Sequence, residues 1–384
     1  EIFTMKSFLV PKEIHFSEGA LNYLSNLEAN KAAIVTDEGV MEELGFLAKT
    51  EGKLAEAKIE TIVIDGVEAN PSVDTVLKGK EAMLDFEPDL VIALGGGSTM
   101  DAAKIMWTFY EYPELKFEDI IEAASIPSLR NKAKFIAIPS TSGTASEITS
   151  FSVITDTKKK IKYPIVSPEI VPDAAIIDPA IPATMPPHIT ANTGMDVLAH
   201  AVESFTSTGA SDYSDPLALK AIKMVFEYLP KAYNNGDDLE ARERMHNAST
   251  IAGMAFSNSS LGIIHSLAHK IGGEFHITHG LANAILLPYV IEYNYQAAEA
   301  KFKSIEKSLE IDNLDDSIRA LNKKLKIPSS FSEIEGTDYS KEDFENVLAR
   351  MSENAHQDPC TLTNPKEPTV EDMKILYKKS FYGE

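Results

Sequence analysis

Five short apolar runs, rich in Val, Ile and Ala, recur along the first half of the chain, each followed by Gly, Pro or Asp. Runs this short and this apolar are typical of strands buried on both faces of a parallel sheet. Stretches with helical spacing, such as 76–84 and 100–110, separate them, and this alternation predicts an α/β fold with helices on both faces of the sheet. The predicted strands are Ala32–Thr36, Thr61–Ile64, Leu90–Leu94, Phe135–Ile138 and Ala175–Ile177, with strand-like pieces at Ser7–Val10 and Ser152–Thr155 for a sheet edge or a hairpin.

The pattern changes after Asp178. A proline-rich piece, 179–187, interrupts regular structure, because proline fixes φ and has no N–H to donate. Beyond it the β-branched runs fade and long stretches of helical period follow, for example 216–233 and 239–256. The sequence therefore predicts an α/β domain over residues 1–183 and an all-helical domain over residues 184–384, consistent with a length that favours two domains.

Charge and cysteine content exclude several classes of function. Lys and Arg number 36 against 58 Asp and Glu, for a formal net charge of −22, so phosphate backbones and anionic lipids would repel the chain. Cys360 is the only cysteine, which excludes an intramolecular disulfide, a thiolate zinc finger and an Fe–S cluster. With no apolar run of about 18 residues and no basic-then-apolar leader, we expect a cytoplasmic protein without nucleic-acid or membrane partners.

The third predicted strand runs directly into Gly95-Gly96-Gly97-Ser98-Thr99. Glycines allow close approach of backbone to a ligand, and the free N–H groups of a helix start favour a pyrophosphate. We expect Ser98 or Thr99 to cap that helix. The pattern is not G-x-G-x-x-G, so a plain tight turn is the alternative to a phosphate site.

Two further features suit a nucleotide. Five of the eight residues in 139–146 carry hydroxyls and follow another strand, which suits phosphate or ribose, although a polar loop with helix caps is the other interpretation. Asp37 ends the first predicted strand, where a carboxylate can accept from ribose hydroxyls and would repel a 2′-phosphate. That favours NAD over NADP, but Asp37 alone is equally suited to cap a helix.

Histidines cluster in the second half. Asp196 and His200 are four residues apart and share a helix face, and His265 and His269 have the same spacing. We expect Gly272-Gly273 to break that second helix before His279, and His276 lies in the same histidine-rich segment. Imidazoles with one carboxylate suit Fe(II) or Zn(II). Against this, a single histidine is more often a satisfied core residue, Asp196 could be a cap, and Glu203 is best explained as an exposed or locally paired carboxylate.

The combined motifs support a family assignment. They are Gly95-Gly-Gly-Ser98 with Asp101, Ser142-Gly-Thr-Ala-Ser-Glu147, Met195-Asp-Val-Leu-Ala-His200, and His265-Ser-Leu-Ala-His269 with His279-Gly-Leu-Ala-Asn-Ala284. This set resembles the iron-containing (group III) alcohol dehydrogenases, which include lactaldehyde reductase, 1,3-propanediol dehydrogenase, butanol dehydrogenases and the alcohol dehydrogenase half of bifunctional aldehyde–alcohol dehydrogenases. The resemblance extends from about Phe8 to about Tyr377.

The resemblance implies a dehydroquinate-synthase-like fold. In it, a Rossmann-like dinucleotide-binding domain and a helical metal-binding domain form the active-site cleft. It assigns the metal, Fe(II) or alternatively Zn(II), to Asp196, His200, His265 and His279. His269 becomes the candidate proton relay, and His276 is left to line the site or contact a ligand residue. The matching dinucleotide positions are Asp37, Asn70, Gly96, Gly97, Ser98, Asp101, Thr141, Ser142, Thr144, Val153 and Lys162, and those near the substrate are Phe151, Phe256 and Cys360.

The implied activity is that of a metal-dependent, NAD(P)H-linked alcohol dehydrogenase or aldehyde reductase, with hydride transfer between nicotinamide and a metal-bound alkoxide. The implied state is a homodimer or larger homo-oligomer. Phe151 replaces the amide that lactaldehyde reductases carry, which favours simple primary alcohols, or a 1,3-diol bound differently, over a 1,2-diol; a packing role is the other interpretation of Phe151. The alternatives are lactaldehyde reductase (1,2-propanediol oxidoreductase), 1,3-propanediol dehydrogenase and, in a different class, a metal-dependent lyase or hydrolase of the same fold. A glycerol-dehydrogenase-like zinc enzyme is a rival that the full four-residue set counts against.

Overall fold

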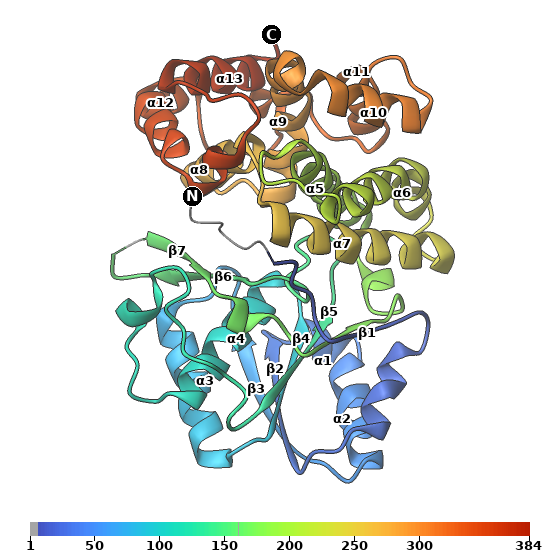
Figure 1. The fold of residues 1–384 in the computed structure, drawn as a ribbon, viewed down its shortest axis with the longest axis vertical. Coiled ribbons are helices and arrows are strands. Elements are labelled where there is room, and N and C mark those ends of the chain that lie inside the picture. The colour runs from blue at the N-terminus through green and yellow to red at the C-terminus, as the bar shows by residue number, and fades with distance from the viewer. Residues whose placement is uncertain (1–6, 160) are drawn as a thin grey trace. The chain divides into compact units, whose positions relative to one another are not determined.

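The structure is a computed structural model that describes residues 7–159 and 161–384 (Figure 1). The chain forms two compact units, one ending at Thr184 and the other running from Met185 to Glu384. Among the described residues, no helix is both long and apolar enough to cross a membrane.

The first unit contains a six-stranded sheet in the order β1-β8-β5-β4-β2-β3, and every pairing in it is parallel. All five predicted strands are confirmed, each extended by one to a few residues. The prediction of a strand at Ser7–Val10 was wrong, because the edge strand forms instead from Glu13-Ile-His-Phe16 and pairs with β8. The strands are β1 (Glu13–Phe16), β2 (Lys31–Asp37), β3 (Glu60–Val67), β4 (Leu90–Gly95), β5 (Lys134–Pro139) and β8 (Ala174–Ile177).

Alternate residues of each central strand face opposite layers of helices. Ala33 and Val35 of β2 pack in a core with α3 and α4, whereas Ala32 and Ile34 pack in a second core with α2 and the first 3₁₀-helix. In Figure 1, α1 and α2 lie on one side of this sheet and α3 and α4 on the other. The helices of this unit are α1 (Val40–Glu43), α2 (Phe46–Glu56), α3 (Val73–Phe86) and α4 (Gly97–Glu111), with 3₁₀-helices at Ala20–Asn26, Phe117–Ile120, Pro168–Ile170 and Pro182–Thr184.

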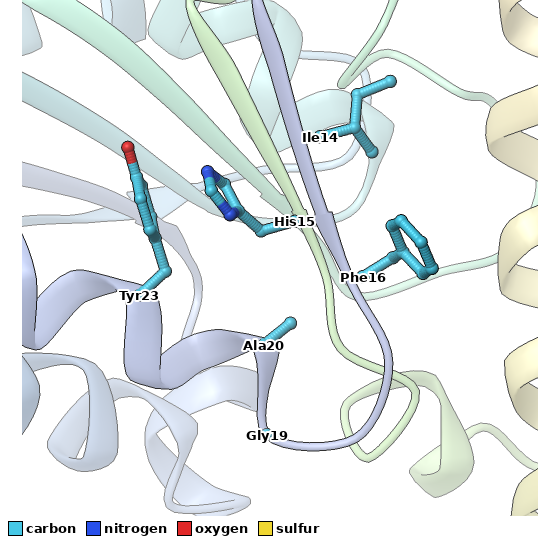
Figure 2. Close-up of a pocket in the computed structure, with 6 residues that line it drawn as sticks. All are labelled: Ile14, His15, Phe16, Gly19, Ala20 and Tyr23. Atoms are coloured by element: carbon cyan, nitrogen blue, oxygen red, sulfur yellow. The ribbon is translucent and has the colours of Figure 1, made fainter.

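A separate antiparallel hairpin, β6 (Phe151–Asp156) with β7 (Ile161–Val166), confirms the strand expected at Ser152–Thr155. On the sheet edge, a small hollow is lined by β1 and the following 3₁₀-helix (Figure 2). There the rings of His15 and Tyr23 stack with centroids 3.5 Å apart, and both side chains bond to Glu13. None of the predicted site residues lines this hollow.

The second unit is helical throughout its described length, so the predicted change of class along the chain is confirmed. Its central helix α5 starts at Pro187, where proline suits the first turn because that N–H has no helical partner. The helices are α5 (Pro187–Thr206), α6 (Ser214–Asn234), α7 (Leu239–Ser259), α8 (Ile263–Phe275), α9 (His279–Asn294), α10 (Glu299–Leu309), α11 (Leu314–Lys324), α12 (Lys341–His356) and α13 (Val370–Tyr382), with 3₁₀-helices at Tyr295–Ala298, Phe331–Glu333 and Pro359–Thr363.

One expectation for this unit was wrong: the pair Gly272-Gly273 does not break α8, which continues to Phe275. Glycine inside a helix costs only about 1 kcal/mol relative to alanine, so tertiary packing can retain it. A side chain at Gly272 would come within 3.0 Å of the Ile277 carbonyl, so this glycine lets the chain turn back closely. The helix ends instead at His276, which adopts left-handed φ of 55°.

Candidate metal centre and dinucleotide site

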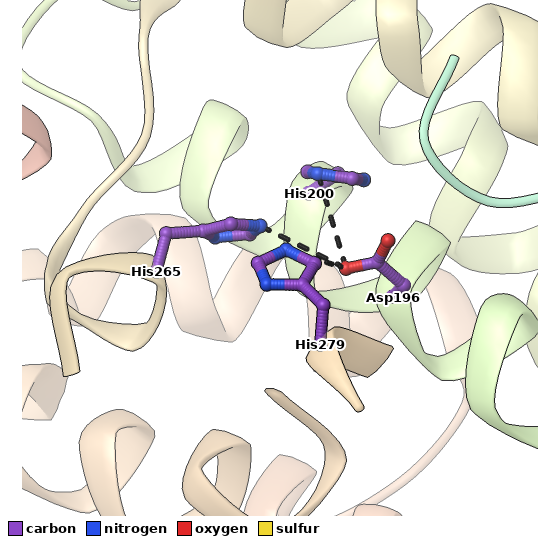
Figure 3. Close-up of side chains that lie close together, drawn as sticks. All are labelled: Asp196, His200, His265 and His279. Atoms are coloured by element: carbon purple, nitrogen blue, oxygen red, sulfur yellow. Dashed lines mark ion pairs between the residues drawn. The ribbon is translucent and has the colours of Figure 1, made fainter. Parts of the chain in front are cut away.

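Three helices bring one carboxylate and three imidazoles together (Figure 3). Helix α5 presents Asp196 and His200 one turn apart, α8 supplies His265 from its first turn, and α9 begins at His279. The Nε2 atoms of His200, His265 and His279 lie 3.9, 3.8 and 3.5 Å from Oδ1 of Asp196. One ligand atom from each residue lies within 4.8 Å of every other, so a single ion could contact all four.

The chemistry of this donor set fits a divalent transition metal. Asp196, His200 and His265 are almost inaccessible to solvent, whereas the His279 side chain is 40% exposed and leaves one open side. Burial, with the neighbouring His200, His279 and His269, lowers the pKa of His265 well below its usual range. Neutral imidazole is the form that binds a metal, and three imidazoles with one carboxylate suit Fe(II) or Zn(II).

Asn283 is a member of this cluster that the sequence interpretation missed. It lies one helical turn after His279, is fully buried, and donates from Nδ2 to Oδ1 of Asp196 at 2.7 Å. The same amide nitrogen lies 3.2 Å from Nε2 of His265 and 3.1 Å from Nε2 of His279. In the sequence, the i, i+4 spacing from His279 was the available indication. An asparagine at that spacing does not by itself predict a place in a metal cluster.

His269 lies beside the four donors but is not one of them. Its ring centroid is 5.5 Å from that of His279 and 6.0 Å from that of His265. Its Nδ1 is 3.1 Å from Oδ2 of Asp358, to which Lys270 also donates at 2.7 Å. Burial acts to raise the pKa of Asp358, but its bonds to His269 and Lys270 hold that pKa well below its usual range.

Cys360 lies close to this pair, and its thiol has a pKa raised well above the usual range by burial. His269, Asp358 and Cys360 could themselves offer three ligand atoms. However, Lys270 already places an ammonium group on the Asp358 carboxylate, and a protonated thiol is a poor ligand. This second group is therefore better described as an ion-paired cluster beside the four-residue centre.

The other predicted substrate-pocket and lining residues fall in three places. Phe256 stacks on His200, with ring centroids 4.3 Å apart, and so covers one side of the metal cluster. Phe151 begins β6 in the α/β unit. His276 is exposed, ends α8 and is not one of the four donors, and its expected place lining the site stays a prediction.

In the α/β unit, the glycine turn at the carboxyl end of β4 leads directly into α4. The helix begins at Gly97 after Gly96, and no side chain caps it, so the expectation of a Ser98 or Thr99 cap was wrong. The Ser98 hydroxyl instead accepts from the Asn70 N–H at 3.3 Å. The helix start is thus left with uncapped N–H groups, which suits a phosphate.

The hydroxyl-rich segment after β5 packs closely on this turn. A side chain at Gly97 would meet Thr144 at 2.8 Å, and one at Gly96 would lie 3.8 Å from Thr141. Ser142 is buried in the same segment. Because β4 and β5 are parallel neighbours, their carboxyl ends place both segments at one sheet edge, where α/β folds bind ligands.

Asp101 turns its carboxylate inward. It accepts from the Ser146 hydroxyl at 2.7 Å and from the Val153 N–H at 2.9 Å, so it joins α4 to the loop and the hairpin. The buried Lys104 extends this link by donating to the carbonyls of Thr149 and Phe151, both at 2.9 Å. Burial lowers the pKa of Lys104 to about 8. These contacts indicate that Asp101 shapes the site rather than presenting a free carboxylate.

Two remaining predicted positions are polar and lie near the turn. Lys162 donates to the Asn70 side chain at 2.7 Å, which joins the hairpin to the loop after β3. Asp37, at the end of β2, accepts through Oδ1 from the N–H groups of Gly39 and Met41 at 3.2 Å. These bonds hold the turn that leads into α1, much as the helix-cap interpretation of Asp37 expects.

Comparisons with known proteins agree with this arrangement. Residues 11–179 match the family model described as iron-containing alcohol dehydrogenase, and residues 190–381 match that of the Fe-containing alcohol dehydrogenase family, C-terminal. The chain is 48% identical to an NADPH-dependent butanol dehydrogenase of Clostridium saccharobutylicum, covering 99% of both chains. It is 41% identical to an aldehyde-alcohol dehydrogenase of Streptococcus pneumoniae, covering 99% of this chain but only 46% of that protein. Among solved structures, an iron-containing alcohol dehydrogenase from Thermococcus thioreducens gives a TM-score of 0.91 at 38% identity, covering 98% of this chain and all of that one.

Proposed function

The chain belongs to the iron-containing alcohol dehydrogenase family, and we propose that it interconverts small primary alcohols and their aldehydes at the four-residue centre. Membership makes it an NAD(P)-linked alcohol dehydrogenase with the dehydroquinate-synthase-like fold. The observation that carries the proposal is the convergence of three imidazole nitrogens on one carboxylate oxygen of Asp196.

In this proposal Asp196, His200, His265 and His279 hold Fe(II), or alternatively Zn(II). When bound, the metal supplies a Lewis acid that polarises the substrate oxygen. The protein's part is to keep the imidazole of His265 neutral by burial and to leave access on the exposed side of His279. The Phe256 ring stacks on His200 and so limits the access of water to another side of the metal cluster.

The α/β unit is proposed to bind the nicotinamide dinucleotide. The uncapped start of α4 at Gly97 would hold the pyrophosphate, because its N–H groups and the helix dipole favour an anion. The neighbouring residues Asn70, Ser98, Thr141, Ser142, Thr144 and Lys162 supply hydroxyl, amide and ammonium groups. Asp101 and Val153 contribute through the contact that fixes the hairpin against α4.

His269 is the proposed proton relay. Its Nδ1 contacts Asp358, which leaves Nε2 available to exchange a proton with the substrate hydroxyl or with solvent. The side chain is 40% exposed, as a group that passes protons to water requires.

The proposed substrates are unsubstituted primary alcohols and aldehydes rather than a 1,2-diol. Phe151 offers apolar surface and no hydrogen bond to a vicinal hydroxyl, and a relative of high identity is named a butanol dehydrogenase. Lactaldehyde reduction and 1,3-propanediol oxidation are the alternatives. Cys360, half-buried near His269, is proposed to lie near the substrate.

For the coenzyme, we propose a preference for NAD(H), because the Asp37 carboxylate would repel a 2′-phosphate. The name of the Clostridium relative, which specifies NADPH, is the contrary indication. The predicted homo-oligomer and cytoplasmic location stay predictions, to be tested by light scattering and by cell fractionation.

An aldehyde panel tests the proposed function. Protein reconstituted without oxygen with Fe(II) or Zn(II) is assayed at 340 nm using NADH and NADPH with propanal, butanal, glycolaldehyde and lactaldehyde. The proposal predicts metal-dependent turnover, fastest with NADH and the unsubstituted aldehydes. Fastest turnover with lactaldehyde would contradict the role of Phe151, and metal-loaded protein with no turnover would favour the lyase or hydrolase alternative.

A further inference from the structure

Glu203 connects two of the helices that form the metal cluster. It lies one turn after His200 on α5, is only 4% exposed, and reaches the first turn of α8. Its Oε1 accepts from the Ile264 N–H at 2.6 Å, and its Oε2 lies 2.6 Å from Nδ1 of His265. The sequence interpretation of Glu203 as exposed or locally paired was wrong, since its partners are about 60 residues away and fully buried.

The contact favours one tautomer of His265. Nε2 binds a metal through its lone pair, so Nδ1 then carries the proton and donates to Oε2 of Glu203. That lone pair faces the cluster, where Nε2 is 3.8 Å from Oδ1 of Asp196. The Asn283 amide nitrogen, 3.2 Å from the same Nε2, can donate to it, which agrees with the same tautomer.

The residues around the Glu203 carboxylate leave little space beside it. A side chain at Gly262 would come within 2.8 Å of Oε1 of Glu203 and within 2.9 Å of Oδ1 of Asn364, so no larger residue fits there. Burial raises the pKa of Glu203 to about 8, although bonds from the backbone groups of Gly262, Ile264 and His265 act to lower it.

We propose that Glu203 is a positioning residue for the metal centre: it holds His265 in the Nδ1–H tautomer and directs Nε2 to the ion. The inference rests on the proposed function, because it assumes that His265 is a metal ligand. Carboxylate groups behind metal-binding histidines orient the ring in this way, and their loss commonly weakens metal affinity about 10- to 100-fold.

The test is the affinity for Zn(II) alone, measured by competition with a chromogenic chelator on the full-length protein. Glu203→Gln keeps the size of the side chain but has one acceptor where the structure uses two, so it cannot serve both Ile264 and His265. We expect its Zn(II) dissociation constant to rise about 10- to 100-fold. The matched control is Glu306→Gln, another buried glutamate of the helical unit, which accepts from the Leu314 N–H and the Tyr295 hydroxyl and contacts none of the four donors. Its Zn(II) affinity should equal that of the wild type.

A second measurement needs no substitution at Glu203. In metal-free protein labelled with ¹⁵N-histidine, the ¹⁵N shifts of His265, assigned with a His265→Gln variant, should show a protonated Nδ1 and an unprotonated Nε2. The opposite tautomer, or Glu203→Gln protein with wild-type Zn(II) affinity, would overturn the inference while leaving the metal site in place. Wild-type protein that binds no Zn(II) would instead refute the proposed function, so the two failures are distinguishable. If Glu203→Gln does not fold, the tautomer measurement decides.

Discussion

The imidazole of His269, the proposed proton relay, has Nδ1 3.1 Å from Oδ2 of Asp358 and its ring stacked on that of His279. We predict that His269→Ala lowers kcat by about 10²- to 10⁴-fold, the usual contribution of general acid–base catalysis, with a small effect on KM. Steady-state assays with matched metal content would check this. The control is His356→Ala, an exposed histidine on α12, and unchanged kcat and pH profile in His269→Ala would contradict the role.

Asp37 has two separable properties, its charge and its bonds to the N–H groups of Gly39 and Met41. Asp37→Asn keeps an acceptor for the turn but removes the charge. We predict that it lowers KM for NADPH on the order of fivefold. The reason is that the Coulomb repulsion between two unit charges about 4 Å apart in water is about 1 kcal/mol. Asp37→Ala, which also removes the turn bonds, serves as the comparison. An unchanged ratio of NADPH to NADH efficiency in Asp37→Asn would show that the charge does not set the preference.

At the residue scale, sequence spacing indicated a metal centre where chemistry and helix period coincide, and the family resemblance named the histidines that would bind. The Asp196/His200 pair and the histidines of 265–279 contain all four residues that the structure brings together. Glu203 and Asn283 were missed because their meaning depends on which helices pack together, and no local pattern states that α5 lies against α8 and α9. His276 shares the histidine-rich segment but, as expected, is not one of the four donors.

Among the elements, the start of α4 packs closely on the hydroxyl-rich loop. An alanine at Gly97 would place its Cβ 2.8 Å from Thr144 and push the hydroxyl-rich loop away from the turn. Because overpacking costs about 1–3 kcal/mol, we predict that Gly97→Ala weakens NADH binding by about tenfold. Fluorescence titration of NADH measures this.

The control for that variant is Gly52→Ala in α2, where an added Cβ meets no atom within 4 Å. It should leave NADH affinity unchanged and stabilise the protein by up to about 1 kcal/mol, because alanine is the better helix former. NADH affinity in Gly97→Ala equal to that of the control would mean that the loop is not part of the coenzyme site.

Elements were predictable where burial is complete. The central strands read as apolar runs because both faces of the sheet are covered, and their ends were placed within one to three residues. The edge strand Glu13–Phe16 was missed because it mixes charged and apolar residues, as a partly solvated strand does, and the more apolar Ser7–Val10 drew the prediction instead. The prediction of a helix break at Gly272-Gly273 was wrong because packing, rather than helix propensity, decides whether this helix continues.

For the whole molecule, the two compact units predict separate responses to two ligands. Metal at 100 times its dissociation constant should stabilise the helical unit by about 2.7 kcal/mol, and NADH should act on the α/β unit. Differential scanning calorimetry should therefore show one transition that moves on metal removal and another that moves with NADH. The division into domains of residues 1–183 and 184–384 stays a prediction. A single transition shifted by both ligands would show that these two parts do not unfold independently.

The central claim is that Asp196, His200, His265 and His279 form the metal centre of an alcohol dehydrogenase. Its most direct test is the rate of NADH oxidation by butanal at 340 nm during anaerobic titration of metal-free protein with Fe(II), with His265→Ala protein as the comparison. The account predicts no rate without metal, a linear rise that ends at one equivalent per chain, and no rise in His265→Ala. Full activity in metal-free protein, or the same titration curve in His265→Ala, would contradict it.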